Sequence, residues 1–316
     1  MGCSDAVPIV ESEATPATES EASAAVESDG AWRLENIQDL GIEGVSPELI
    51  KNSDGNYLLL ATTISPDRVF ESSDGINFSP SSIMLPPGSD YSVIQKADGT
   101  FLLYFVGFDM QPPNPSQMEP NDANPQQQNQ PMDPSKAKKK VFVSTSSDLQ
   151  NFSEPIFTGI EQETSEPAWG VPDTYFDLDG NIKMMWVEMI EGERDEVLLT
   201  ATSKDGITFT RDSNVALKGG YVDPYMLQVA PEDWILLLST TPHRLPQKLF
   251  AAYSQDGENW TVEKQPLLEE KDFNNLDPSA VEVAEDRWKL IYSNVDLNNA
   301  LSGPYAYKIA DLILEK

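Results

Sequence analysis

From residue 32 onward the chain repeats one pattern of hydrophobic and polar positions. Short apolar segments, some alternating with polar residues, are separated by turn pairs such as Asp54-Gly55 and Asp98-Gly99, which favour tight hairpins. The second segment of a repeat, for example residues 235–238, is apolar at every position. Such segments predict short strands that are buried between neighbouring sheets.

The repeats keep a fixed internal spacing. Near its start each has an opening residue: Ser46, Asp90, Val171, Asp223 or Asp277. Eleven positions later a large apolar residue begins the second strand: Tyr57, Phe101, Ile182, Trp234 or Trp288. Sheet-sized repeats of roughly 40–50 residues are typical of β-propellers. The five equal spacings predict an all-β fold, a five-bladed β-propeller with four-stranded antiparallel blades.

A second motif, Ser-x-Asp-Gly-x-x-aromatic, closes four of the repeats. Its copies cover residues 72–78, 146–152, 203–209 and 254–260, with Leu149 once in place of Gly. Asp can bond its own downstream backbone and Gly accepts positive φ, so the motif predicts a tight turn. The fifth repeat lacks the motif, whereas residues 28–32 carry a shortened copy. We therefore expect the N-terminal segment 32–37 to supply the outer strand of the last blade, which closes the ring and removes an exposed edge.

Composition divides the chain further. The net charge of −31 disfavours a nucleic-acid partner, because phosphate binding needs a positive surface. Residues 1–30 contain seven acidic residues and no basic one, and we expect a disordered tether there, because so few large apolar side chains cannot offset the ordering entropy. Residues 109–140, rich in Pro, Gln and Asn, predict a low-complexity insertion in the second blade that overhangs the central pocket. The propeller is then expected to span residues 31–316.

The single cysteine, Cys3, follows Gly2 at the head of the acidic segment, and one cysteine excludes an internal disulfide. This setting resembles the mature start of bacterial lipoproteins, in which a cysteine after a small residue is lipidated. The resemblance implies an extracytoplasmic protein that contacts the membrane only through a lipid anchor at Cys3. The alternative is a free thiol near a flexible terminus. No run of eighteen apolar residues predicts a membrane span.

The five-repeat plan, with its Asp-Pro openings and Ser-x-Asp-Gly-x-x-aromatic turns, resembles the five-bladed propeller glycoside hydrolases of families 43, 32 and 130. The turns themselves are similar to the Asp boxes of sialidases. The resemblance implies an axial funnel with an Asp base from the first blade, an Asp that tunes acidity from the second, and a Glu acid from the third. Asp90 occupies the second-blade position. The first and third hold Ser46 and Val171, so the sequence departs from the family at both of the other carboxylates.

Further acidic and aromatic residues lie near these positions. The candidate catalytic residues are Asp90, Asp173, Glu188 and Asp223. The candidate substrate-binding residues are Trp169, Tyr221, His243, Arg244 and Asp277. Each also has a purely structural interpretation, such as turn capping by the aspartates or packing of the aromatics between blades. No cofactor is required and no zinc-type spacing occurs, although carboxylates around the axis could hold Ca²⁺.

Two functions follow from these patterns. The first is a surface-anchored, glycoside hydrolase-like enzyme acting on oligosaccharide or polysaccharide in an acidic axial pocket. The second is a non-catalytic propeller that binds carbohydrate or a partner and has lost the first- and third-blade catalytic carboxylates. A sialidase would need three converging arginines and an Arg-Ile-Pro signature, and the sequence shows neither. We expect a monomer in either case.

Overall fold

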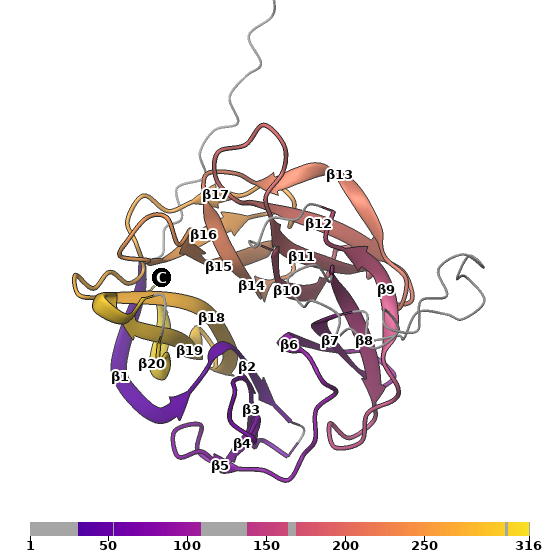
Figure 1. The fold of residues 1–316 in the computed structure, drawn as a ribbon, viewed down its shortest axis with the longest axis horizontal. Helices are drawn as coiled ribbons and strands as arrows, with labels where there is room; N and C mark the ends of the chain where they lie inside the picture. Colours follow the sequence, from indigo (N-terminus) through magenta and orange to yellow (C-terminus); the bar gives the residue numbers. More distant parts are fainter. Residues whose placement is uncertain (1–30, 53, 109–137, 164–168, 301–302, 316) are drawn as a thin grey trace, which may run out of the picture.

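The computed structural model describes residues 31–52, 54–108, 138–163, 169–300 and 303–315. Its strands form five four-stranded antiparallel sheets arranged around a ring (Figure 1). The inner strands β2, β6, β10, β14 and β18 each contact the next, and β18 contacts β2, so the circle is closed. The five-bladed β-propeller predicted from the repeat spacing is confirmed.

Each blade runs from the axis outward. Blade 1 contains β2 (Val45–Lys51), β3 (Tyr57–Thr62), β4 (Val69–Ser72) and β5 (Ser79–Pro80). Blade 2 contains β6 (Ser89–Gln95), β7 (Phe101–Phe108), β8 (Lys139–Ser146) and β9 (Ile156–Glu161). Blade 3 contains β10 (Trp169–Phe176), β11 (Ile182–Glu188), β12 (Val197–Ser203) and β13 (Thr210–Leu217). Blade 4 contains β14 (Tyr221–Ala230), β15 (Asp233–Thr240), β16 (Leu249–Ser254) and β17 (Thr261–Val262). Blade 5 contains β18 (Phe273–Ala284), β19 (Arg287–Asp296), β20 (Ala306–Glu315) and β1 (Ala31–Glu43), with the short 3-10 helix η2 (Leu297–Asn299) after β19.

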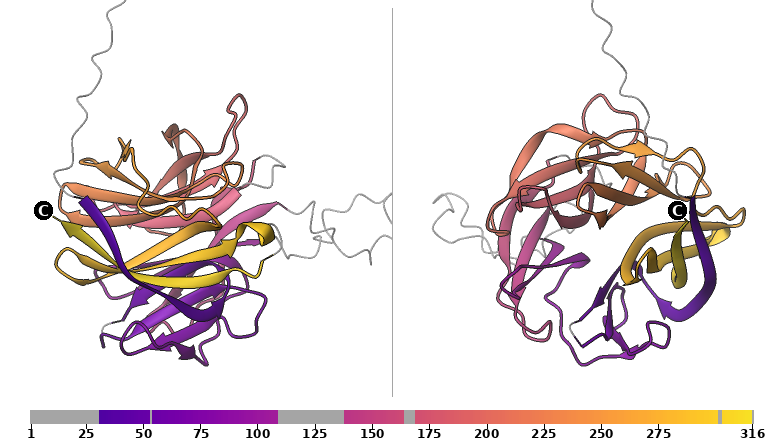
Figure 2. Two further views of the ribbon diagram at one scale, coloured as in Figure 1. Left: turned by 90° about the vertical axis from the view of Figure 1, so that its left-hand side faces the viewer. Right: turned by 180° about the vertical axis from the view of Figure 1, so that it is seen from behind.

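Blade 5 is built from both ends of the described chain. Strand β1 pairs antiparallel with β20, with Trp32 opposite Leu314, and both views of Figure 2 show the two strands side by side. The ring centroids of Trp32 and Trp288 in β19 are 5.3 Å apart, so the N-terminal strand packs against the core of the blade. The predicted ring closure is confirmed, and the strand is longer than the segment expected to form it.

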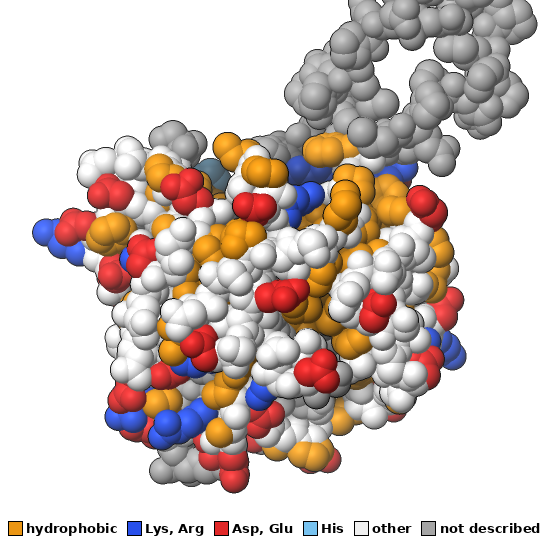
Figure 3. Space-filling view, turned by 90° about the horizontal axis from the view of Figure 1, so that it is seen from below, with side chains coloured by type: hydrophobic (Ala, Val, Ile, Leu, Met, Phe, Trp, Pro, Cys, Tyr) orange, Lys and Arg blue, Asp and Glu red, His pale blue; other side chains and the backbone are white. Residues whose placement is uncertain are grey.

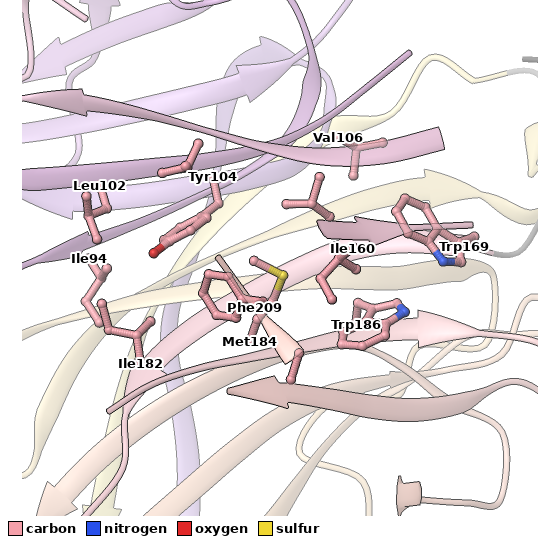
Figure 4. Close-up of a cluster of buried hydrophobic side chains, with 13 residues drawn as sticks. Ile94, Leu102, Tyr104, Val106, Ile160, Trp169, Ile182, Met184, Trp186 and Phe209 are labelled. Carbon is pink, nitrogen blue, oxygen red and sulfur yellow. The ribbon is translucent and has the colours of Figure 1, made fainter. Parts of the chain in front are cut away.

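Apolar packing between blades holds the ring together. All seven residues of β11 are buried, because the sheet is covered on both faces by neighbouring blades. Between blades 2 and 3 the side chains of Tyr104, Met184 and Trp186 belong to one cluster (Figure 4). Each such side chain contributes about 1.5–3 kcal/mol when removed from water, so the apolar residues of the second strands stabilise this architecture.

The repeated turns share one hydrogen-bond pattern. In the copy at residues 203–209, Ser203 Oγ accepts the N–H of Gly206 at 2.9 Å and Asp205 Oδ1 accepts that of Ile207 at 2.8 Å. The same bonds occur in the other three copies. Leu149 takes φ 58° where the others have Gly, so the turn keeps its geometry at the expense of local strain.

The predicted insertion has a different C-terminal boundary in the structure. Strand β8 begins at Lys139, so Lys139 and Lys140 belong to blade 2, and residues 109–137 lie outside the described residues. The tether predicted for residues 1–30 also lies outside them. Figure 3 shows the molecule from the side, where acidic side chains are scattered among hydrophobic, basic and other side chains. Within the described part of the chain, no helix has the length and apolarity needed to cross a bilayer.

Candidate active site

The innermost strand of every blade carries the same β-bulge at its opening residue. In blade 1, Val45 pairs with Thr62 and the next pair is Glu48 with Leu60, and the other four blades show the same two-residue gap. All five opening residues adopt the left-handed conformation: Ser46 (φ 45°), Asp90 (51°), Val171 (48°), Asp223 (54°) and Asp277 (52°). Bulges of this kind re-aim a side chain and are frequent beside active sites. Here they turn opening residues toward the axis.

Two positions after each opening residue, a polar side chain faces the next blade. In four blades it accepts a backbone N–H from the neighbouring inner strand. The pairs, with the acceptor first, are Glu48 and Val93 (2.9 Å), Ser92 and Thr174 (3.1 Å), Asp173 and Met226 (2.7 Å), and Ser279 and Leu49 (2.9 Å). In the remaining blade the Tyr225 hydroxyl lies near the Ala280 N–H, so the five side chains form a ring of hydrogen-bonding groups around the axis.

An axial pocket lies within this ring. It is lined by Ser46, Pro47, Glu48, Asp90, Tyr91, Val171, Pro172, Asp173, Pro224, Tyr225, Asp277 and Pro278. Four of these side chains are carboxylic acids, and no lysine, arginine or histidine of the described residues lies within ion-pair distance of them. Without a compensating cation, burial favours the protonated form of such groups.

Asp223 and Asp277 form a coupled pair of buried carboxyl groups. Asp223 Oδ2 accepts the Ser239 hydroxyl and, at 3.4 Å, the N–H of Asp277, while Asp277 Oδ2 accepts the N–H of Ser46 at 2.9 Å. Burial raises the pKa of Asp223 to about 6. Burial, and then the charge of Asp223, raises the pKa of Asp277 well above its usual range. Asp277 lines the pocket, whereas Asp223 is buried and is not part of the lining, so the pair can hold a proton at the pocket wall near neutral pH.

Glu48 and Asp173 lie in the hydrogen-bonded ring. Burial raises the pKa of Asp173 to about 7, against the opposing effect of the Met226 N–H. Burial and then the charge of Asp173 raise the pKa of Glu48 well above its usual range. The structure thus brings the predicted residue Asp173 to the pocket, where its observed role is to join blades 3 and 4.

Asp90 is the more accessible of the opening aspartates. It is half-buried, its N–H donates to Thr62 Oγ1 at 2.8 Å, and its carboxylate accepts the Ser89 hydroxyl at 3.0 Å. A Cβ on Gly170, which has φ 134°, would lie 3.3 Å from Asp90 Oδ2. Blade 3 therefore needs glycine at this position to let the Asp90 carboxylate approach its backbone.

Glu188 lies apart from the pocket-lining residues. Its side chain is 1% exposed and pairs with Arg211 Nη1 at 3.1 Å. Trp186 Nε1 donates to the same carboxylate oxygen at 3.1 Å, and the Arg211 guanidinium lies over the Trp186 ring. The structure therefore places Glu188 in a buried ion pair within blade 3, so the expectation that it faces the pocket is wrong.

The two predicted aromatic residues pack between elements. Trp169 is 4% exposed and belongs to the core cluster between blades 2 and 3 (Figure 4). Tyr221 is half-buried and packs against Phe250 with ring centroids 5.6 Å apart. A ring as buried as that of Trp169 presents no face for stacking on a sugar, so the packing interpretation describes it better.

His243 and Arg244 lie together in the segment that follows β15. Arg244 pairs with Asp195 and donates to Gly219 O at 2.8 Å. His243 Nε2 is 3.8 Å from the buried carboxylate of Glu196. Neither lines the axial pocket, so both belong to a polar group between blades 3 and 4.

Several residues of the site were missed by the sequence reasoning. Tyr225 and Ser279 belong to the hydrogen-bonded ring, and Ser239 supports the Asp223–Asp277 pair. The sequence did contain a signal for these residues, because the position two residues after each opening residue holds a hydrogen-bonding side chain in all five repeats. Among the described residues, no three Asp, Glu, His or Cys side chains are grouped to hold a metal ion, and Ca²⁺ on the axis stays a prediction.

Comparison with solved structures agrees with this architecture. A thermostable family-43 glycoside hydrolase superimposes with a TM-score of 0.65 at 14% identity, over 87% of this chain and 94% of that one. The chain has the fold of the family-43 glycoside hydrolases. An α-L-arabinofuranosidase from Lactobacillus brevis gives 0.61 at 13% identity, over 87% and 92% of the two chains. An endo-1,4-β-xylanase from Bacteroides thetaiotaomicron gives 0.59 at 13%, over 89% and 97%.

Comparisons based on sequence alone identify no relatives of this kind. No protein-family model matches the chain, and a search of the curated proteins finds no match. The resemblance inferred from the repeats is thus confirmed at the level of fold, and the chemistry of the pocket has to be argued from its own residues.

Proposed function

We propose that the protein is a glycoside hydrolase that acts on an oligosaccharide at the axial pocket. One observation carries this proposal: the opening aspartates of blades 2, 4 and 5 gather around the axis. The charge of Asp90 contributes to raising the pKa of both Asp223 and Asp277, which places the three carboxyl groups within electrostatic reach of one another. The fold supports the same proposal, since the similar solved structures include glycoside hydrolases.

Glycoside hydrolysis needs two carboxyl groups in different protonation states. One protonates the leaving oxygen, and the other, ionised, activates water or attacks the sugar. Asp277, coupled to Asp223, is the proposed proton donor because burial keeps a proton on this pair near neutral pH. Asp90 is the proposed base because it lines the pocket and is the more exposed carboxylate.

The second candidate function is carbohydrate binding without turnover. Ser46 and Val171 stand at opening positions where the family resemblance implies carboxylates. In that case the pocket would bind the sugar, and the aspartates would accept hydrogen bonds from its hydroxyls.

The test is a screen of aryl glycosides and of plant and algal oligosaccharides, read out both as released sugar and as binding. Asp90→Asn and Asp277→Asn should each lower turnover by about 100-fold or more. Glu282→Gln is the matched control, because Glu282 is exposed on β18, the strand that carries Asp277. Binding with no turnover by the wild type would establish the second function. Turnover that survives both aspartate substitutions would remove these residues from the mechanism.

We also propose that the protein is monomeric and is held at an extracytoplasmic membrane surface by a lipid on Cys3. The support is the Gly2-Cys3 pair followed by a long acidic segment. Labelling with a radioactive fatty acid during bacterial expression should mark the wild type and not Cys3→Ala. Equal labelling of the two proteins would contradict the anchor, and light scattering of the purified protein would test the monomer.

A further inference from the structure

Val171 is strained in a way that its counterparts are not. All five opening residues have φ between 45° and 54°. Aspartate and serine reach this left-handed region with modest strain, because a short polar side chain can bond nearby groups. A β-branched side chain at positive φ is a real outlier. Strain of this kind persists where the surrounding structure holds it in place, and it gathers at functional sites.

Within the described residues, Val171 takes no part in the packing or the links that hold the other opening positions. Val171 is half-buried, and none of the five hydrophobic clusters in the described part of the chain includes it. In two other blades the opening carboxylates, Asp223 and Asp277, accept the N–H of the next opening residue. A valine side chain offers no acceptor, so Val171 contributes neither to core packing nor to these links between blades.

The surroundings of Val171 show where its side chain acts. It lines the axial pocket together with Asp90 and Asp277, and its neighbour Gly170 brings blade 3 close to the Asp90 carboxylate. The isopropyl group is thus a small apolar surface beside the proposed base, in a pocket whose other side chains are four carboxylic acids, four prolines, two tyrosines and Ser46. An apolar group of a ligand that contacts this isopropyl group displaces water from it, which favours binding.

We propose that Val171 determines specificity by contacting a methyl group of the bound sugar, either the C6 methyl of a 6-deoxyhexose or the methyl of an acetyl substituent. The inference rests on the proposed function, since it needs a sugar in the axial pocket. A hydroxymethyl group at the same place would set its hydroxyl against a surface that offers no hydrogen bond. One such contact discriminates by roughly 10- to 200-fold.

The experiment compares pairs of sugars that differ only at this group. The p-nitrophenyl glycosides of D-fucose and D-galactose test the C6 methyl, those of N-acetylgalactosamine and N-formylgalactosamine test the acetyl methyl, and free L-rhamnose and L-mannose add a second 6-deoxy pair. Binding is measured by calorimetry and, where turnover occurs, by kcat/KM. The wild type should favour the methyl-bearing member of one pair by about tenfold.

Three variants isolate the side chain. Val171→Thr keeps the shape and the backbone strain but replaces one methyl with a hydroxyl, so the preference should fall to about one- to twofold with little change in Tm. Val171→Asn relieves the strain, so it should raise Tm and also abolish the preference. Glu282→Gln should leave both the sugar preference and Tm unchanged.

The outcomes separate the two proposals. Equal binding of both members of every pair by the wild type, or a preference that survives in Val171→Thr and Val171→Asn, overturns the role of Val171 and leaves the proposed function standing. Failure of the wild type to bind any sugar in this set or in the wider screen overturns the proposed function, and the role of Val171 with it.

Discussion

Replacing Asp173 by Asn should make the stability of the protein less dependent on pH. Asp173 is 6% exposed, and burial raises its pKa from 3.8 to about 7. Between these two values the folded protein binds one more proton at this group than the unfolded chain does. The free energy of unfolding therefore falls as pH rises from about 4 to about 7, and changes little with this group above that. At about 1.4 kcal/mol per pH unit, the separation of the two pKa values amounts to roughly 4 kcal/mol.

Asparagine removes the charge but keeps an acceptor for the ring. Its side-chain oxygen can still accept the N–H that Met226 donates to Asp173 at 2.7 Å, so the inner strands stay joined. The variant is thus expected to resemble the wild type near pH 4 and to be more stable than it above pH 7. The gain in the free energy of unfolding should reach a few kcal/mol, up to the roughly 4 kcal/mol derived above.

The assay is urea denaturation followed by tryptophan fluorescence, from about pH 4 to about pH 8.5. The quantity of interest is the difference in unfolding free energy between Asp173→Asn and the wild type at each pH, because contributions of groups that do not interact with Asp173 then cancel. Glu48, whose pKa the charge of Asp173 raises, changes the difference in the same direction. Glu282→Gln serves as the control and should follow the wild type throughout. The reasoning fails if the difference is independent of pH, or if the variant loses stability relative to the wild type as pH rises.

Three further substitutions test other parts of the structure. Arg211→Met should cost about 3–5 kcal/mol, because it leaves the buried carboxylate of Glu188 without its cation; urea denaturation measures this. Gly170→Ala should lower both Tm and turnover, because its Cβ would press on the Asp90 carboxylate; activity assays beside thermal melts separate the two effects. Ser203→Ala should cost about 1–3 kcal/mol, because the N–H of a buried turn loses its acceptor; Tm reports it.

Each of these substitutions has a control of the same type. Arg287→Met changes an exposed arginine, and Ser213→Ala an exposed serine, so both should be nearly neutral. Gly192→Ala adds a Cβ at φ 91° with nothing within 4 Å, so it carries the backbone strain without the contact. Equal loss of turnover in the two glycine variants would contradict the role given to Gly170, and a stable Arg211→Met would show that the ion pair is dispensable.

The main features of the fold were accessible from the sequence, because they rest on local patterns. The eleven-residue spacing from Ser46 to Tyr57 recurs because the distance along the chain from the bulge to the large apolar residue of the second strand is the same in every blade, although the inner strands run from 7 to 12 residues. The missing turn after the fifth repeat correctly indicated that the strand around Trp32 completes blade 5. The β-bulge at the opening residues could not be predicted, since no sequence pattern indicates that a valine such as Val171 adopts φ 48°.

The candidate site was only partly accessible. Asp90, Asp173 and Asp277 lie at the pocket as their spacing predicted. Glu188 does not, because Arg211 reaches it from β13, on the far side of the same blade. The role of Tyr225 was missed, since a tyrosine in an apolar strand segment indicates packing unless its neighbours in the next blade are known.

By itself, the sequence determined the number of blades, their order and the place where the ring closes. It also determined that Ser46 and Val171 depart from the carboxylates of the resembling family. Only the tertiary structure decided which acidic groups share protons and which are neutralised by a cation. Asp223 and Asp277 are 54 residues apart, and their contact arises from the curvature that brings successive inner strands around one axis. Strand periodicity and turn chemistry act over a few residues, whereas burial and charge coupling depend on the whole ring.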